Sequence, residues 1–160
     1  MMSDRGCFMN DMALQGGNPP ESNQRNPAVN VEIDLAERFA LATRKHCFVT
    51  GRAGTGKTTL LKRLVERNEK NAVVVAPTGV AAVNAGGVTI HSMFGLPLTC
   101  FVPSNDFVDP AIATNRKRLL SGHLRMRKEK LRVLRETELL IIDEVSMVRC
   151  DTLDAIDAVL

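Results

Sequence analysis

The sequence contains no tryptophan and no tyrosine, and aromatic residues make up only 4% of its 160 positions. Flat aromatic side chains are the platforms on which unpaired nucleic-acid bases stack, so a binding surface built on aromatic stacking is not expected. Three phenylalanines in the second half of the chain, Phe94, Phe101 and Phe107, are therefore interpreted as core residues or loop anchors.

Cysteine pairs, histidine clusters and long apolar runs are absent as well. The four cysteines are scattered, with no CxxC pair, and the three histidines are too dispersed to form a metal site. These residues are Cys7, Cys47, Cys100 and Cys150, and His46, His91 and His123. Because no run is long enough to span a membrane and no signal peptide is visible, we expect reduced thiols, no membrane partner and a cytoplasmic protein, associated with the nucleoid if bacterial.

Composition divides the chain. Residues 1–30 are rich in Asn, Pro, Gly and Ser without periodicity, which predicts a disordered leader, and residues 31–160 are expected to form an α/β domain. The net charge of +3 hides a basic block, because residues 116–135 hold nine Lys or Arg and one acid, Glu129. Two interpretations stay open: a cationic surface beside nucleic acid, or the solvated face of one helix or of two helices with a break near Ser121 and Gly122.

The glycine-rich stretch GRAGTGKT, from Gly51 to Thr58, lies between an apolar run that ends at Thr50 and a helical pattern that begins at Lys57. A buried strand, a glycine loop and a helix N-terminus in this order are the setting of a P-loop. The glycines let backbone N–H groups approach a polyphosphate, while the lysine supplies charge and the Thr58 hydroxyl suits Mg²⁺. The stretch therefore predicts a site for a nucleoside triphosphate with Mg²⁺.

The surrounding pattern predicts the other elements. Helical spacing follows Asp34, a plausible N-cap, and an apolar run at 72–76 predicts a second buried strand. We expect a turn at 77–79, a short helix ending near Gly86 and Gly87, a short extended piece and turn at 88–98, a loop at 97–110 and a last helix at about 152–159. Strands joined through a helix predict a parallel sheet whose ligand lies at the carboxyl edge.

The stretch LLIIDE is an apolar run at 139–142 that stops at two consecutive carboxylates, Asp143 and Glu144. Neighbouring parallel strands end at one edge of a sheet, so Asp143 is expected within reach of a Mg²⁺ ion beside Thr58. Glu144 is then expected to orient and polarise the attacking water. A metal clamp and a positioned nucleophile are what phosphoryl transfer requires.

Taken together, GRAGTGKTTLL, APTGVAAVNAGGVTIHSMFGLPL and LLIIDEVSMVRCDTLDAID resemble motifs I, Ia, Ib and II of the first RecA-like domain of the Pif family of superfamily 1 DNA helicases. The resemblance covers residues 33–160. It implies a P-loop NTPase fold, in which helices cover both faces of a RecA-like parallel sheet. It also implies ATP hydrolysis that drives 5′-to-3′ translocation on single-stranded or forked DNA, in DNA repair, recombination and telomere maintenance.

The resemblance assigns roles by position. It makes Lys57 and Glu144 catalytic and gives Mg²⁺ to Thr58 and Asp143. The residues that it implies for nucleotide binding are Gly51, Ala53, Gly54, Thr55, Gly56, Lys57, Thr58 and Thr59. Those that it implies for DNA binding are Pro77, Thr78, Gly79, Thr89, His91 and Ser92. Without the family, Thr78 and Gly79 are ordinary turn and capping residues, and His91 is a capping or core histidine.

Two features depart from the family pattern. No glutamine that would read adenine precedes the P-loop between Glu32 and Lys45, and the chain stops one helix after motif II. We therefore expect a fragment, incomplete at its C-terminus, that binds Mg-nucleotide and hydrolyses it poorly, with a second RecA-like domain in the full-length product. The alternatives are another P-loop enzyme, such as an AAA-type ATPase or a small-molecule kinase, and a catalytically incomplete fragment that only binds nucleotide or a partner.

Overall fold

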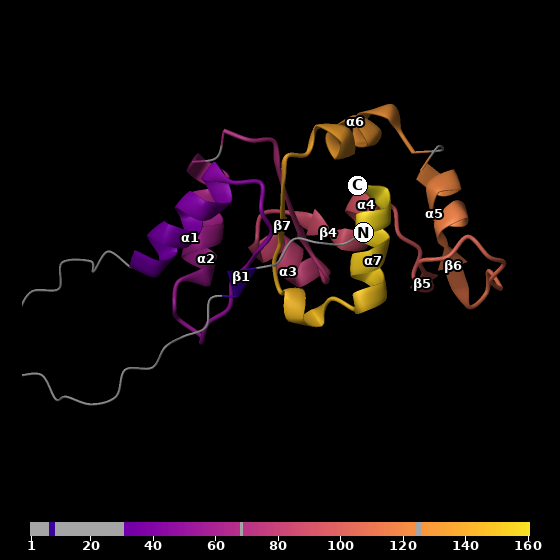
Figure 1. Cartoon of the computed structure of the whole chain (residues 1–160), viewed down its shortest axis with the longest axis horizontal. Coiled ribbons are helices and arrows are strands. Elements are labelled where there is room, and N and C mark those ends of the chain that lie inside the picture. Colours follow the sequence, from indigo (N-terminus) through magenta and orange to yellow (C-terminus); the bar gives the residue numbers. More distant parts are fainter. Residues whose placement is uncertain (1–6, 9–30, 68, 124–125) are drawn as a thin grey trace, which may run out of the picture. The chain divides into compact units, whose positions relative to one another are not determined.

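The computed structural model describes residues 7–8, 31–67, 69–123 and 126–160, which fall into two compact units, Met1–Asn68 and Glu69–Leu160. Figure 1 labels most of the helices and strands, and each unit is described here by itself. None of the helices in these ranges has the length and apolar character needed to cross a membrane.

The first unit consists of two packed helices, α1 (Val31–Ala42) and α2 (Lys57–Arg67), and a short parallel pair of strands, β1 (Cys7–Phe8) and β2 (Cys47–Phe48). The leucines buried on α2 are Leu60, Leu61 and Leu64. Ion pairs fasten the two helices together, because Arg63 lies 2.7 Å from Asp34 and Arg67 lies 3.2 Å from the buried Glu37.

Several expectations for this unit are corrected. Helix α1 begins at Val31, so Asp34 lies inside the helix and pairs with Arg63 instead of capping the N-terminus. The strand before the P-loop is two residues long, and Phe48 and Val49 are 44% and 41% exposed rather than buried. The reason is that β2 pairs in this unit with β1 over only two residues. Strand β1 lies within the predicted leader. The rest of that leader is outside the described residues.

The second unit is organised on a three-stranded parallel sheet in the order β4 (Val88–Thr89), β3 (Ala72–Ala76), β7 (Leu139–Ile142). In its register Val75 lies opposite Val88 on one side and Ile142 on the other. The parallel sheet predicted from 72–76 and 139–142 is confirmed. Among the described residues β2 pairs with β1 and not with these strands, so its place in this sheet stays a prediction.

The core of this unit surrounds β3. Helices α4 (Ile90–Phe94), α6 (Lys128–Glu136) and α7 (Cys150–Val159) contribute to it, and Phe94 is only 1% exposed. A second cluster joins β5 (Cys100–Val102), α5 (Arg116–His123) and α7 through Phe101, Leu119 and Ala155. Phe94 and Phe101 are thus core residues, as predicted, whereas Phe107 is 90% exposed.

Local geometry explains where the expectations for this unit were wrong. Residues 90–94 form a helix rather than a turn, because the Thr89 hydroxyl caps its start and Gly95, with φ 60°, ends it. The loop expected at 97–110 contains β5, which pairs with β6 (Ala113–Asn115). The two-helix form expected for the basic block is confirmed, because α5 ends at His123, just after the expected break, and α6 begins at Lys128.

The start of α7 is tied to β5 by Asp151. Its carboxylate accepts a hydrogen bond from the Phe101 N–H at 3.1 Å and pairs with Arg149 at 2.9 Å. The hydrogen bond from Arg149 holds the pKa of Asp151 below its ordinary value. Because its pKa is lower in the folded chain, the ionised Asp151 stabilises the fold at pH values above its unfolded-state pKa of about 4. This stabilisation is lost as the pH falls through the folded-state pKa.

Unfolding by urea at a series of pH values tests this tie. Below about pH 4 the free energy of unfolding is expected to fall more steeply for the unaltered chain than for Asp151→Asn. The difference is expected to stay under about 1 kcal/mol, because Arg149 is exposed. Asp154→Asn, which removes an exposed carboxylate from the same helix, serves as the control and is expected to keep the unaltered slope. Equal slopes for Asp151→Asn and the unaltered chain would contradict the prediction.

Candidate functional site

The loop between β2 and α2 has the backbone of an anion cradle. Gly54 and Gly56 have φ angles of 80° and 95°, in the left-handed region that favours glycine. A Cβ at Gly54 would meet no atom within 4 Å, so the backbone there is open to a ligand. Helix α2 begins at Lys57, and the first N–H groups of a helix have no intrahelical partners. These features fit a polyphosphate.

Lys57 lies across this loop. Its ammonium group donates to the carbonyl oxygens of Gly51 at 2.7 Å and Arg52 at 2.9 Å. The Thr55 hydroxyl donates to the same Arg52 carbonyl at 2.9 Å, which fixes the turn. The Thr58 side chain is exposed. Phosphate oxygens are stronger acceptors than carbonyls, so a bound phosphate would draw the lysine away from these two partners.

In the second unit, three of the predicted motifs lie along one edge of the sheet. Strands β3, β4 and β7 are parallel, so the segments at their carboxyl ends share that edge: 77–79, 89–92 and 143–144. The ladder continues past β7, because the Asp143 N–H donates to the Val75 carbonyl at 2.9 Å. The sheet therefore gathers the neighbouring Ia-like and Ib-like segments with the Walker B segment, which lies far from them in sequence.

Two threonines at this edge cap helices. The Thr78 hydroxyl accepts from the Ala81 N–H at 3.2 Å and begins α3 (Gly79–Asn84), and the Thr89 hydroxyl accepts from the Ser92 N–H at 3.2 Å and begins α4. The capping interpretation of Thr78 is confirmed. A Cβ at Gly79 would meet nothing within 4 Å, so the backbone at the start of α3 is open.

The two carboxylates after β7 differ in conformation. One Asp143 oxygen accepts from the Glu144 N–H at 3.0 Å. Glu144 has φ 51° and ψ 42° and is the one non-glycine residue with positive φ in the ranges that the structure describes. This left-handed conformation costs about 1–2 kcal/mol in a residue with a Cβ. Backbone strain held at an exposed carboxylate is typical of functional positions.

Sequence reasoning missed two residues that hold α4. The Lys130 ammonium donates to the carbonyl oxygen of Ser92, and His123 Nε2 lies 2.6 Å from the carbonyl oxygen of Phe94. These contacts join positions 38 and 29 residues apart, so no local pattern announces them. Among the described residues, no group of three or more His, Cys, Asp or Glu side chains is placed to hold a metal ion. Any Mg²⁺ here would therefore need oxygens from a nucleotide.

Comparison with known proteins gives one consistent answer. The family model described as PIF1-like helicase matches residues 29–160. The "ATP-dependent DNA helicase Pif1" of Psychrobacter sp. (strain PRwf-1) is 35% identical over 123 residues, which are 75% of this chain and 16% of that protein. The chain thus spans about a sixth of that relative's length.

Solved structures agree with this similarity. A crystal structure of Bacteroides Pif1 bound to ssDNA shares 42% identity with a TM-score of 0.64, over 82% of this chain and 27% of that one. Bacteroides sp Pif1 in complex with ADP-AlF4 shares 41% identity with a TM-score of 0.65, over the same shares of the two chains. These likenesses support the RecA-like α/β fold expected from the sequence.

Proposed function

This chain belongs to the PIF1-like helicase family, and we propose that it binds ATP with Mg²⁺ and contributes to ATP hydrolysis in a DNA helicase motor. The observation that carries the proposal is the glycine loop, which has positive φ at Gly54 and Gly56, open backbone at Gly54 and Lys57 across it, and which leads directly into α2. Family membership removes the grounds for the alternatives of an AAA-type ATPase and a small-molecule kinase.

In this proposal the loop backbone and Lys57 bind the phosphates, and the lysine exchanges its two carbonyl partners for β- and γ-phosphate oxygens. Thr58 and Asp143 are the protein ligands for Mg²⁺, because a hydroxyl and a carboxylate oxygen suit that hard cation. The bound cation supplies charge neutralisation for the phosphates. Glu144 orients and polarises the attacking water.

The DNA-binding part of the proposal concerns the edge of the sheet in the second unit. Open backbone at Gly79 and small side chains at Thr78, Thr89 and Ser92 suit contacts to phosphate and sugar, which carry no sequence information. A relative of this chain is described in its crystal structure as bound to ssDNA. We propose that residues 77–79 and 89–92 lie along a single strand. Forked DNA as a partner, and 5′-to-3′ polarity, stay predictions.

A Lys57→Ala variant tests the nucleotide site. Removing a charged donor is expected to weaken binding of a fluorescent ATP analogue about 10- to 100-fold, since a hydrogen bond to a charged group contributes about 1.5–3 kcal/mol. Lys62→Ala, which removes an exposed lysine one turn further along α2, is the matched control and is expected to bind normally. Equal affinities of the two variants for the ATP analogue would show that Lys57 does not bind the nucleotide.

Turnover of ATP with and without single-stranded DNA tests the coupling to DNA. Stimulation by DNA in the unaltered chain, absent in Lys57→Ala, would support a motor segment. The unaltered chain could instead bind nucleotide but turn it over no faster than Lys57→Ala. That result would support the alternative of a segment that only binds nucleotide.

A further inference from the structure

Described residues at the end of α5 and around the start of α6 contact α4 and the glycine that ends it. His123, the last residue of α5, is buried with Nε2 at 2.6 Å from the Phe94 carbonyl oxygen. Met126 lies beside Gly95, the residue that ends α4, because a Cβ at Gly95 would lie 2.9 Å from the Met126 methyl carbon. Lys130, in the first turn of α6, donates to the Ser92 carbonyl. These three contacts place the end of α5 and the start of α6 beside α4.

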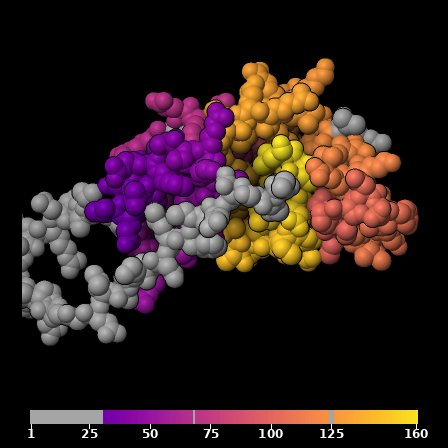
Figure 2. Space-filling model, in the orientation of Figure 1, coloured from indigo at the N-terminus to yellow at the C-terminus, as the bar shows by residue number. Residues whose placement is uncertain are grey.

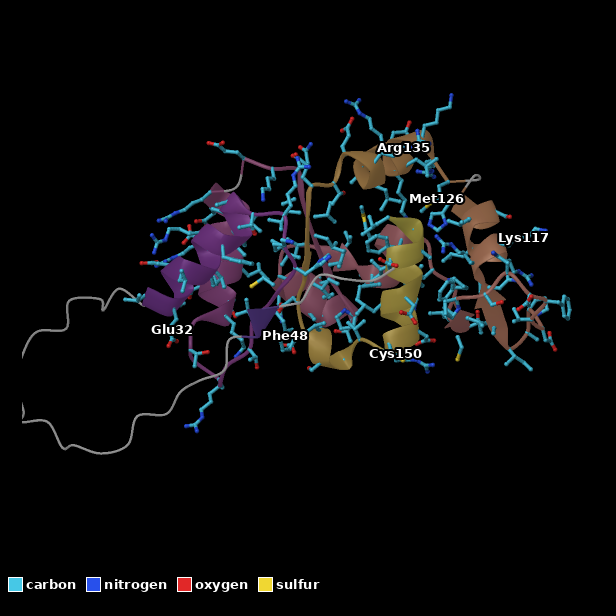
Figure 3. All side chains as sticks on the ribbon, viewed as in Figure 1. Glu32, Phe48, Lys117, Met126, Arg135 and Cys150 are labelled. Atoms are coloured by element: carbon cyan, nitrogen blue, oxygen red, sulfur yellow. The ribbon has the colours of Figure 1, made fainter. Side chains whose placement is uncertain are left out.

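Figure 3 shows Met126 between α5 and α6, with the side chain of Arg135 further along α6. The surface of α6 is the orange region along the upper edge of the second unit in Figure 2. Its buried residue is Leu134, while Arg127, just before the helix, and Lys128 are exposed. Within the basic block, Lys130 contacts the Ib-like residue Ser92. Arg127 and Lys128 lie three and two positions before Lys130.

The basic side chains at the two ends of α6 differ in whether they form ion pairs. Near the C-terminus Arg132 pairs with Glu136 at 2.8 Å. At the N-terminus, no ion pair within the described part of the chain engages the side chain of Arg127 or Lys128, and Arg127 makes no side-chain cap. Cations at a helix N-terminus face the positive end of the helix dipole, which is unfavourable for folding. Folding stability therefore does not account for these two cations.

We propose that Arg127 and Lys128 bind the phosphodiester backbone of single-stranded DNA next to Ser92 and so extend the DNA-binding surface of α4 onto α6. This inference rests on the proposed function of residues 89–92. Two unpaired cations fit an anionic polymer, and phosphate contacts release counterions without reading sequence. In this proposal the middle of the basic block, at Arg127 and Lys128, is a cationic surface beside nucleic acid. The C-terminal end of α6 is a solvated helix face.

The test is the salt dependence of binding to a fluorescein-labelled oligo(dT), followed by anisotropy. For the Arg127→Gln/Lys128→Gln variant, the slope of log K against log salt concentration is expected to become shallower by about 1.4, since each contact to a single strand contributes about 0.7. Affinity at about 0.1 M salt is expected to fall roughly tenfold or more. The variant is expected to be at least as stable as the unaltered chain in urea, because it relieves the helix dipole.

Lys117→Gln/Arg118→Gln on α5 removes the same charge from two exposed residues and is the control. Figure 3 shows Lys117 on α5. A control slope equal to that of the unaltered chain supports a local contact at Arg127 and Lys128. If the slope becomes shallower by the same amount in both double variants, the change is due to the net charge of the chain, and the inference is overturned. An unchanged slope in the Arg127→Gln/Lys128→Gln variant would overturn this inference but not the proposed DNA contacts of residues 89–92. If the unaltered chain does not bind oligo(dT), both the inference and those proposed contacts are overturned.

Discussion

Replacing Gly87 by alanine is expected to unfold the second unit or to destabilise it by about 3 kcal/mol or more. An added Cβ would lie 2.2 Å from the carbonyl oxygen of Val74 and 2.9 Å from the Val74 Cβ. Val74 belongs to β3, the central strand, where it lies opposite Ile141 of β7. The backbone of a central strand cannot move aside without breaking one of its two ladders.

The neighbouring glycine provides a matched control. Gly86 has φ 69°, but a Cβ there would meet nothing within 4 Å. Gly86→Ala is therefore expected to cost about 1–2 kcal/mol, the price of the left-handed backbone alone. Urea unfolding followed by circular dichroism compares the two variants with the unaltered chain. A Gly87→Ala midpoint equal to or above that of Gly86→Ala would show that β3 and β4 are not packed as described.

The second large effect concerns Glu144. Glu144→Gln is expected to lower ATP hydrolysis in the presence of single-stranded DNA by about 10² or more and to leave nucleotide binding unchanged, since a carboxylate that polarises water contributes about 10²–10⁴. Single-turnover hydrolysis of labelled ATP measures the rate. Glu69→Gln, which changes an exposed carboxylate elsewhere in the second unit, is expected to keep the unaltered rate. Hydrolysis at the unaltered rate in Glu144→Gln would exclude Glu144 as the catalytic carboxylate.

The backbone of Glu144 adds a separate readout. Asparagine tolerates the left-handed region better than glutamate or glutamine, so Glu144→Asn is expected to raise the free energy of unfolding by about 1 kcal/mol. Glu144→Gln keeps the same backbone cost and is expected to match the unaltered stability. A gain in stability with a loss of hydrolysis is the pattern expected where strain is kept for function.

The sequence by itself determined the local features of this protein. Positive φ angles at Gly54 and Gly56 follow from the glycine loop, and the strands at 72–76 and 139–142 follow from apolar runs that end before Pro77 and Asp143. Each of these depends on residues close in the chain, through steric limits and hydrophobic pattern. The motif order was also sufficient for the family resemblance, which the match over 29–160 confirms.

Only the tertiary structure decided what depends on distant partners. The strand order β4-β3-β7 and the two-residue length of β2 follow from which segments pair with one another. The contact of Lys130 with Ser92 places the start of α6 beside α4, whereas Arg132 pairs with Glu136 further along the same helix. A charge run has the same local pattern in both cases, because the pattern records polarity, whereas the partner of each charge is fixed by packing between segments far apart in sequence.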